Sequence, residues 1–377
     1  MTVYLDYAAT TPIDPEVRDL VLHYMVEEFG NAGSRTHDFG SRAKQAVEHA
    51  REQVAAVVGA KLDEVVFTSG ATESNNLAIL GLSLHGEKTG RKHIVSTAIE
   101  HKAVLEPLEE LEKRGFEVTL VRPTRGGWVD PTEVHAAVRP DTLLVSVMHV
   151  NNETGVVQPI AEVAELLGDH PAYFHVDGAQ GFGKELEGPR HTRIDLISVS
   201  GHKIYAPKGV GALITRRRGY HRAPLTPLMY GGGQERGLRP GTLPVHLIAG
   251  LGLAAEIAVR DSRKRAEACK AFRQQVLGAL LPLGAVLHGD PTRTMPHVVN
   301  LSLPGIDSEA LMVAWKGLVA ISNGSACTSH NYQASHVLMA MGLAEDSVQG
   351  AARLSWSHHT PPVAWNRAAE LIGDLQM

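Results

Sequence analysis

The feature that most constrains the fold is an alternation, from about residue 41 to 250, of amphipathic segments with short runs of β-branched residues. Such alternation is typical of βα units that build a mostly parallel sheet flanked by helices. Residues 41–58 place alanine and valine at helical spacing and stop at Gly59, which predicts a helix there. The runs expected to form strands are 65–68, 93–97, 143–148, 173–176, 196–199 and 211–215.

A second unit is expected in the C-terminal third of the chain. An apolar-periodic stretch runs from Thr242 to about Leu281, and a Pro/Gly-rich break then precedes the strand-like runs 298–303 and 319–322. For 377 residues, about 150 residues per domain suggests two domains. We expect residues 15–251 to form a large domain, and residues 1–14 with 252–377 to form a smaller α+β domain.

Composition excludes several classes of protein. A 44% hydrophobic and 20% charged chain is ordinary for a globular α/β protein. The net charge of −5 argues against a broadly basic surface for nucleic acid. Neither a signal peptide nor an apolar run of ~18 residues is present, so we expect a cytoplasmic protein without a membrane span. The two cysteines form no CxxC and the histidines are scattered, so no metal site is predicted.

Polar residues and glycines follow several of the predicted strands, where open α/β sheets place their ligands. In FTSGATESNN, Gly70 permits a tight turn and a helix begins at Ala71. The free N–H groups of that helix suit a phosphate, to which Thr72 adds a hydroxyl donor. A glycine at such a corner also serves packing alone, so this segment by itself does not identify a site.

Two further strand ends carry stronger candidates. YFHVDGAQ places Asp177 and Gln180 after a strand. An aspartate there is commonly a helix cap, but a carboxylate facing a pyridine nitrogen keeps that nitrogen protonated. ISVSGHKIYAPKG places Lys203 beside Ser200 and His202, which suits a Schiff base with a phosphate nearby, although most lysines are exposed and inert.

The two cysteines differ in their surroundings. Cys327 in ISNGSACTSH has polar neighbours such as Asn323 and Ser325, which indicates an accessible loop in which a thiolate reacts. A single cysteine is nevertheless more often a small buried residue than a nucleophile. Cys269 has ordinary helical spacing in RAEACKAF, which predicts a structural role.

Taken in order, a series of motifs resembles the cysteine desulfurases of the NifS and IscS type, which belong to aminotransferase class V and to the fold-type I pyridoxal-phosphate enzymes. The motifs are YLDYAATTP, GNAGSRTH, FTSGATESNN, IEHKAVL, MHVNNETGVVQPI, HVDGAQ, SGHKIYAPKG, GGGQERGLRPGTLP, SNGSACTS and ARLSWS. The resemblance covers nearly the whole chain. It implies pyridoxal 5'-phosphate as cofactor, L-cysteine as substrate, a homodimer, and a protein that accepts the sulfur.

The resemblance also implies a role for individual residues. Lys203 binds the cofactor aldehyde and acts as the base, and Cys327 takes the sulfur as a persulfide on a loop that moves between cofactor and acceptor. The other cofactor positions are Asp177 at the ring nitrogen, Gln180 near the ring hydroxyl, His101 stacked on the ring and handling thiol protons, Ala71, Thr72, Ser200 and His202 at the phosphate, and Thr242 at the phosphate of the neighbouring subunit. Asn152 and Arg353 match groups that hold the substrate carboxylate.

Three departures from the family pattern are visible: GNAGS lacks a proline, HVDGAQ has Gly178 in place of a bulkier residue, and SWSHH follows Arg353. Relatives of this kind serve iron–sulfur assembly, transfer-RNA thiolation or DNA phosphorothioation. The stretch SACTSHNYQASHVL most resembles the phosphorothioation desulfurases of the DndA type, in which DNA contacts would belong to partner proteins.

Two alternatives remain open. A selenocysteine lyase, cysteine-sulfinate desulfinase or aminotransferase on the same scaffold would share Lys203 and Asp177 without requiring Cys327. A cofactor-free binding or scaffold protein that kept the fold is the alternative from another class.

Overall fold

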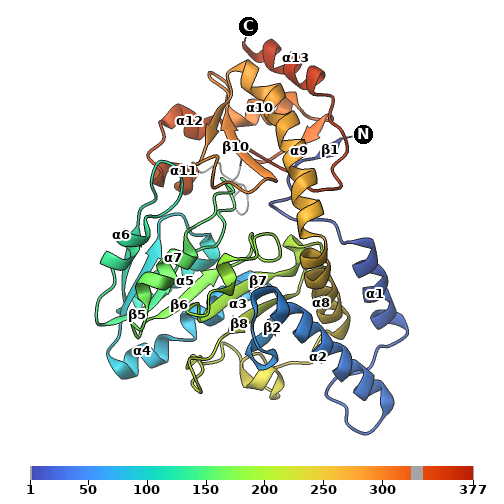
Figure 1. Cartoon of the computed structure of the whole chain (residues 1–377), viewed down its shortest axis with the longest axis vertical. Helices are drawn as coiled ribbons and strands as arrows, with labels where there is room; N and C mark the ends of the chain where they lie inside the picture. Colours follow the sequence, from blue (N-terminus) through green and yellow to red (C-terminus); the bar gives the residue numbers. More distant parts are fainter. Residues whose placement is uncertain (1, 324–333, 377) are drawn as a thin grey trace.

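The computed structural model describes residues 2–323 and 334–376, and its lower part is built on a seven-stranded sheet (Figure 1). The strand order is β2-β8-β7-β6-β5-β3-β4; β8 is antiparallel to both neighbours and the other pairs are parallel. The predicted α/β fold with a mostly parallel sheet is therefore confirmed. The strands are β2 (Val65–Thr68), β3 (His93–Thr97), β4 (Glu117–Val121), β5 (Thr142–Ser146), β6 (Tyr173–Asp177), β7 (Leu196–Ser200) and β8 (Gly211–Thr215).

Helices cover both faces of this sheet, and strand residues alternate between two hydrophobic cores. Val65 and Phe67 belong to one core, while Val66 between them belongs to the other, as the two-residue period of a strand requires. The helices of this part are α1 (Pro15–Val26), α2 (Asp38–Val58), α3 (Ala71–Leu80), α4 (Ser83–Thr89), α5 (Lys102–Lys113), α6 (Pro131–Ala136), α7 (Ile160–Leu167) and α8 (Val245–Arg260).

The structure changes three expectations about these elements. Helix α2 begins before residue 41, because the His37 side chain accepts the Gly40 N–H and caps it. Strand β4 was not predicted, because it is an edge strand in which only Val121 is buried. The helical stretch after Thr242 is two helices, α8 and α9 (Ser262–Leu280), that meet at Asp261.

A smaller sheet forms the upper part of the molecule (Figure 1). Its antiparallel order is β12-β10-β9, and a parallel pair, β1 with β11, joins the N-terminus to this part. Trp315, Trp356 and Leu5 belong to a separate core here, while Val337 and Leu338 pack on a core of the large sheet. The division at residue 251 remains a proposal.

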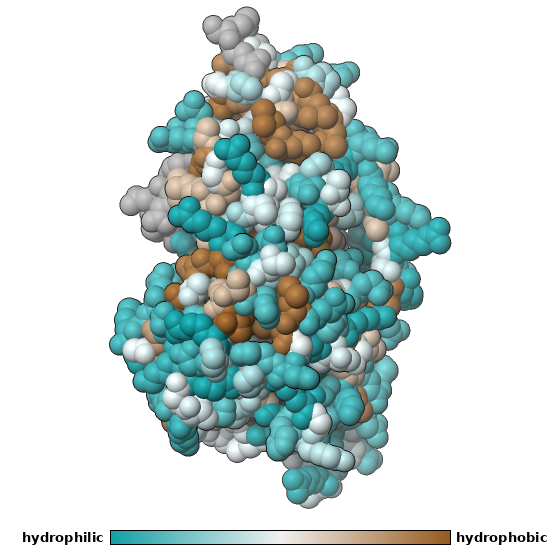
Figure 2. All heavy atoms as spheres, turned by 60° about the vertical axis from the view of Figure 1, so that its left-hand side comes forward, coloured by the Kyte–Doolittle hydropathy of each residue, from teal (hydrophilic) through white to brown (hydrophobic). Residues whose placement is uncertain are grey.

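The elements of the upper part are β1 (Val3–Tyr4), β9 (Val286–His288), β10 (Val298–Ser302), α10 (Ser308–Ala314), β11 (Val319–Ala320), α11 (His336–Ala340), α12 (Glu345–Gln349), β12 (Ala351–Ser355) and α13 (Trp365–Gln376). Short 3₁₀ helices are η1 (Leu62–Glu64), η2 (Gly188–Arg190), η3 (Gly201–Lys203), η4 (Gln234–Gly237) and η5 (Leu281–Leu283). On the face that Figure 2 shows, hydrophilic residues cover most of the lower end, and hydrophobic patches lie higher up and across the middle. Among the described helices, none is both long and apolar enough to cross a bilayer.

Candidate active site

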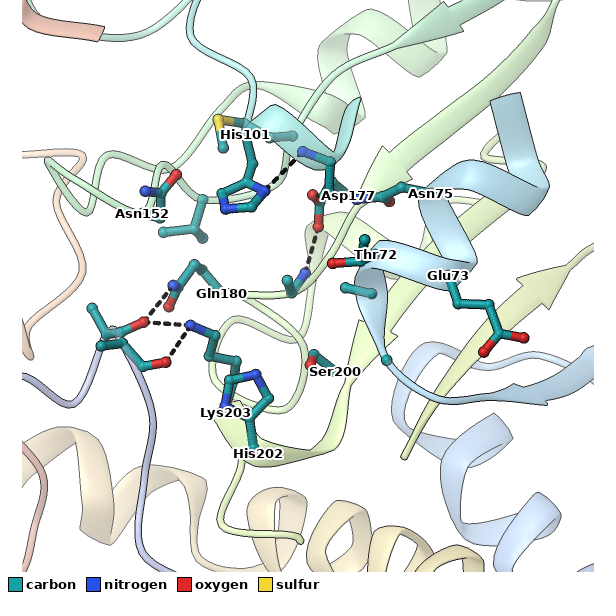
Figure 3. A pocket seen from close by; sticks show the side chains of 18 of the residues that line it. Thr72, Glu73, Asn75, His101, Asn152, Asp177, Gln180, Ser200, His202 and Lys203 are labelled. Carbon is teal, nitrogen blue, oxygen red and sulfur yellow. Dashed lines mark hydrogen bonds between the residues drawn. The ribbon is translucent and has the colours of Figure 1, made fainter. Parts of the chain in front are cut away.

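A cavity of about 490 Å³ lies at the carboxyl ends of β6 and β7, where the sheet order predicts a ligand site (Figure 3). Residues from the N-terminal segment, the ends of several strands and β12 of the smaller sheet meet around it. The candidates from the sequence that line it are Ala71, Thr72, His101, Asn152, Asp177, Gln180, Ser200, His202, Lys203 and Arg353. The structure therefore brings together residues that lie up to 282 positions apart, as the interval from Ala71 to Arg353 shows (353 − 71).

The amine of Lys203 points into this cavity from η3, directly after β7. Its Nζ donates hydrogen bonds to the carbonyl oxygens of Ala8 at 2.6 Å and Ala9 at 2.8 Å. Gln180 Nε2 donates to the same Ala8 oxygen at 2.9 Å. The N-terminal segment thus orients the lysine amine and the Gln180 amide toward each other.

Asp177 ends β6 and presents a buried carboxylate to the cavity. Oδ1 accepts the Ala179 N–H at 2.9 Å, and Oδ2 accepts Nδ2 of Asn75 at 2.8 Å. Asn75 was not among the predicted site residues. Asn75 lies on α3, one helical turn after Ala71, and therefore on the same face of the helix. This spacing from a predicted phosphate-binding residue is the sequence signal that would have indicated Asn75.

The N-terminus of α3 is the candidate anion site within the cavity. Gly70 is the N-cap residue and provides no side-chain cap, so the N–H groups of the first turn face the cavity without a capping oxygen. Gly70 has φ +154°, and a Cβ on Gly211 would lie 2.6 Å from the Gly70 Cα, so both positions require glycine. Ser200, His202 and Lys208 line the same cavity.

The two histidines of the site are held in their neutral forms. His101 Nδ1 accepts the Ala103 N–H at 3.0 Å, which assigns the ring hydrogen of the neutral imidazole to Nε2. Burial lowers the pKa of His101, and the charge of Asp177 partly opposes that shift. Burial, together with Lys203, Lys208 and Lys184, lowers the pKa of His202 to about 4.

Arg353 reaches the cavity from the smaller sheet. Nη2 donates to Asp6 Oδ1 at 2.6 Å and Nη1 donates to the Asn152 carbonyl at 2.8 Å. Nε is buried and has no hydrogen-bond partner in the part of the chain that the structure describes. The guanidinium is 2% exposed, so these contacts fix it tightly. A buried arginine in this position suits a substrate carboxylate, because its donors match the two oxygens.

Two of the predicted residues are not among the described residues that line the cavity. Thr242 is exposed on the segment that precedes α8 and does not line the cavity of its own chain. Cys327 lies outside the described residues, so its predicted role and the predicted motion of its loop stay predictions. Cys269 is buried on α9, as its spacing indicates.

The residues of this cavity fit pyridoxal 5'-phosphate. An uncapped helix N-terminus suits its phosphate, a buried carboxylate suits its ring nitrogen, and an amine between them suits its aldehyde. Within the described residues no group of three or more histidine, cysteine, aspartate or glutamate side chains is placed to hold a metal ion.

Comparison with known proteins identifies relatives that cover most of the chain. The aminotransferase class-V family model matches residues 3–361. The cysteine desulfurase IscS of Vibrio cholerae serotype O1 is 45% identical over 375 residues, which are 99% of this chain and 92% of that protein. IscS of Escherichia coli O139:H28 is 44% identical with the same coverage.

Solved structures show the same relationship. DndA from Streptomyces lividans is 52% identical, with a TM-score of 0.82, and the match covers 94% of this chain and 99% of that one. A structure described as a NifS-like protein is 34% identical, with a TM-score of 0.89 and coverage of 100% of this chain and 98% of that one. A structure described as SspA in complex with cysteine is 35% identical, with a TM-score of 0.85, and the match covers 96% and 100%.

Proposed function

The chain belongs to the aminotransferase class-V family and is a cysteine desulfurase, and from this premise we propose which of its residues perform the reaction. L-cysteine is converted to L-alanine, and its sulfur passes to Cys327 and then to an acceptor protein. The convergence of the Lys203 amine, the Asp177 carboxylate and the uncapped N-terminus of α3 on one cavity carries this proposal.

Enzymes of this family depend on pyridoxal 5'-phosphate, which, when bound, supplies an electron sink for the bonds at the substrate Cα. We assign its phosphate to the N–H groups of Ala71 and Thr72 with the side chains of Ser200 and His202. Asp177 would hold the ring nitrogen and keep it protonated, and Asn75 and the Ala179 N–H keep that carboxylate in place. Gln180 would hold the ring hydroxyl, and His101 would hold the face of the ring.

The substrate is oriented by its carboxylate and activated by proton transfer. Arg353 and Asn152 bind the carboxylate of L-cysteine at the end of the cavity formed by β12. Nζ of Lys203 removes the Cα proton as the general base. His101 exchanges the thiol proton through Nε2, because its Nδ1 already accepts the Ala103 N–H. Its lowered pKa keeps the ring uncharged near neutral pH.

Cys327 is the proposed nucleophile. Its thiolate attacks the substrate sulfur, the carbon–sulfur bond of the substrate breaks, and a persulfide forms on Cys327 while the carbon skeleton is released as alanine. A persulfide is sensitive to reductants and oxidants, so a partner protein is its productive destination. The 52% identity to DndA supports an acceptor in DNA phosphorothioation over one in iron–sulfur assembly or transfer-RNA thiolation.

We also propose a cytoplasmic homodimer. Tyr220 and Tyr230, on the segment that leads to Thr242, are 96% and 83% exposed, which suits contact with a second copy. In such a dimer Thr242 would reach the phosphate of the other subunit. Light scattering of the purified protein should give twice the chain mass of 40.6 kDa; a monomer would contradict this part of the proposal.

The experiment that tests the function compares two cysteine variants in the holoenzyme. Cys327→Ser should keep the absorbance of the bound cofactor and lose alanine and sulfide production, whereas Cys269→Ser, at the other cysteine, should keep both. Lys203→Ala should lose the absorbance band. Sulfide release at the parental rate by Cys327→Ser would instead support another class-V reaction, and absence of any cofactor band in the parent would support a binding protein.

A further inference from the structure

A second, smaller cavity is lined by residues that follow β6, β7 and β12, by residues that precede β10, and by residues of α8 and α9. Its volume is about 50 Å³, which at roughly 10–15 Å³ per water-sized group holds about three to five such groups. Its walls are mainly apolar and include Ile204, Met295 and Trp356. Against these walls lie nitrogen-bearing side chains that the proposed reaction does not use.

Several nitrogen atoms of these side chains have no hydrogen-bond acceptor among the described residues. His297 is 8% exposed, lines the cavity, and its ring forms no hydrogen bond with any described residue. The Nδ1 atom of His358 and the Nε atom of Arg265 are buried and have no hydrogen-bond partner within residues 2–323 and 334–376. Unpaired buried donors of this kind are costly unless a ligand or water satisfies them.

Lys184 adds a cationic group to the same cavity. The ionisable groups that act on it are Lys203 and Cys269, and no aspartate or glutamate is present among the described residues that line the cavity. Burial and the charge of Lys203 together lower the pKa of Lys184 to about 7. A protonated Lys184 is therefore disfavoured here for want of an opposite charge.

The surrounding groups show the same lack of negative charge. Burial lowers the pKa of His297 far below its usual value, and lowers that of His358 to about 4 even though Asp261 opposes the shift. Asp14 lies 3.3 Å from Nη2 of Arg265 and is the carboxylate paired with it. The side of the cavity that faces Lys184, His297 and His358 has no such partner among the described residues.

We propose that this cavity binds a small, weakly hydrated monovalent anion, of the size of bromide or hydrosulfide, between Lys184, His297, His358 and Arg265. The cavity volume limits the ligand to a few atoms, and the donors select an anion. The apolar walls favour a weakly hydrated ion, because a strongly hydrated ion loses more hydration free energy on entering such a site.

Binding at this site is linked to proton uptake. An anion beside Lys184 favours its charged form, so the anion binds best when the amine is protonated. With a pKa of about 7 for Lys184, the protonated fraction falls roughly tenfold between about pH 6 and about pH 8, and the affinity should fall by a similar factor. The anion also contacts Ile204 and Tyr205, which directly follow Lys203, and thereby joins that segment to the smaller sheet.

The test uses bromide and the cofactor-loaded enzyme. Crystals grown without halide and soaked in bromide at about pH 6 should show an anomalous peak in the cavity, and the peak should weaken at about pH 8. Lys184→Met should lose the peak. Lys270→Met, an exposed lysine on α9 next to Cys269, is the matched control and should keep it.

Bromide found only on the outer surface would be an adventitious ion only and would overturn the proposal, as would an equal cavity peak in Lys184→Met. If that variant does not fold, the thermal unfolding midpoint of the parent enzyme provides a second measurement. Bromide should raise that midpoint more at the lower pH than at the higher one, both in the parent and in Lys270→Met. An equal shift of the midpoint at both pH values would contradict the link between anion binding and protonation of Lys184, and would overturn the proposed site.

Discussion

Asn75 donates a hydrogen bond of 2.8 Å from Nδ2 to Oδ2 of Asp177, and both side chains are buried. The bond connects α3, whose N-terminus is the candidate phosphate site, to the carboxylate at the end of β6. One helix therefore orients both ends of the proposed cofactor. This connection makes Asn75 a positioning residue whose effect reaches the cofactor through Asp177.

Asn75→Ala should weaken cofactor binding and lower kcat/KM for L-cysteine about tenfold, because a hydrogen bond to a charged group contributes about 1.5–3 kcal/mol. Cofactor titration followed by absorbance, together with alanine production, measures both effects. Asn76→Ala is the matched control, since the Asn76 side chain donates to the backbone carbonyl of Thr72 and not to Asp177. Equal cofactor affinity in Asn75→Ala and Asn76→Ala would exclude the positioning role.

Glu100 should make stability depend on pH. Its side chain is fully buried, and Oε1 accepts hydrogen bonds from Thr97 Oγ1 and the Met148 N–H. None of the described residues forms a hydrogen bond with Oε2. Burial, with a contribution from Asp177, raises the pKa of Glu100 from 4.5 to about 8. The folded state thus holds a proton that the unfolded state releases, so this stabilisation is fully present below about pH 4.5 and is lost as the pH rises through about 8.

Glu100→Gln keeps a neutral side chain of the same shape and should remove this dependence. Urea unfolding between about pH 5 and about pH 8 measures the free energy of unfolding of both proteins. As the pH rises, this free energy should increase in the variant relative to the parent by up to about 1.4 kcal/mol per pH unit. Glu109→Gln changes an exposed residue of α5, so its unfolding free energy should depend on pH as that of the parent does. Parallel pH profiles for the parent and Glu100→Gln would contradict a protonated Glu100.

Arg353→Lys should raise the KM for L-cysteine about 10- to 100-fold, because lysine cannot reproduce the paired donors that a carboxylate requires. The absorbance of the bound cofactor should stay unchanged, since Arg353 is assigned to the substrate and not to the cofactor. Steady-state kinetics with both readouts separates the two roles. Arg367→Lys on the exposed face of α13 is the control, and an unaltered KM in Arg353→Lys would rule out the carboxylate assignment.

Arg51→Ala should lower the unfolding free energy by about 3–5 kcal/mol, because it leaves a buried carboxylate unpaired. Arg51 forms two bonds of 2.9 and 2.8 Å with Glu235, whose backbone has φ +47°. The double variant Arg51→Met with Glu235→Gln should recover more than half of the loss, since glutamine still accepts the Phe67 N–H.

The control for this pair is Glu48→Ala, because Glu48 is an exposed partner 3.5 Å from Arg51. Removal of the Glu48 side chain should lower the free energy of unfolding by less than about 1 kcal/mol. Urea unfolding of the three variants measures each value. A double variant as unstable as Arg51→Ala would show that packing, and not the unpaired charge, causes the loss.

Much of the large sheet and part of the site follow from local sequence. The period of two in the β-branched runs and of about 3.6 in the segments between them indicates which faces are buried, and hence a parallel sheet between helices. Parallel strands end at a common edge, so Asp177 and Lys203 were expected there together. The edge strand β4 was missed because its side chains are mostly not buried and carry no such signal.

The sequence by itself determined the βα order, the helix at residues 38–58 to within three residues, and the residue types that meet at the strand ends. Only the tertiary structure decided that Arg353 contacts Asp6, 347 residues away, that Asn75 holds Asp177, and that Lys184 shares a cavity with His297. The reason is physical. Hydrophobic periodicity is a pattern among residues close in sequence, and it indicates only whether a side chain faces inward. Which distant side chain it meets depends on how whole elements pack, and no local pattern specifies that partner.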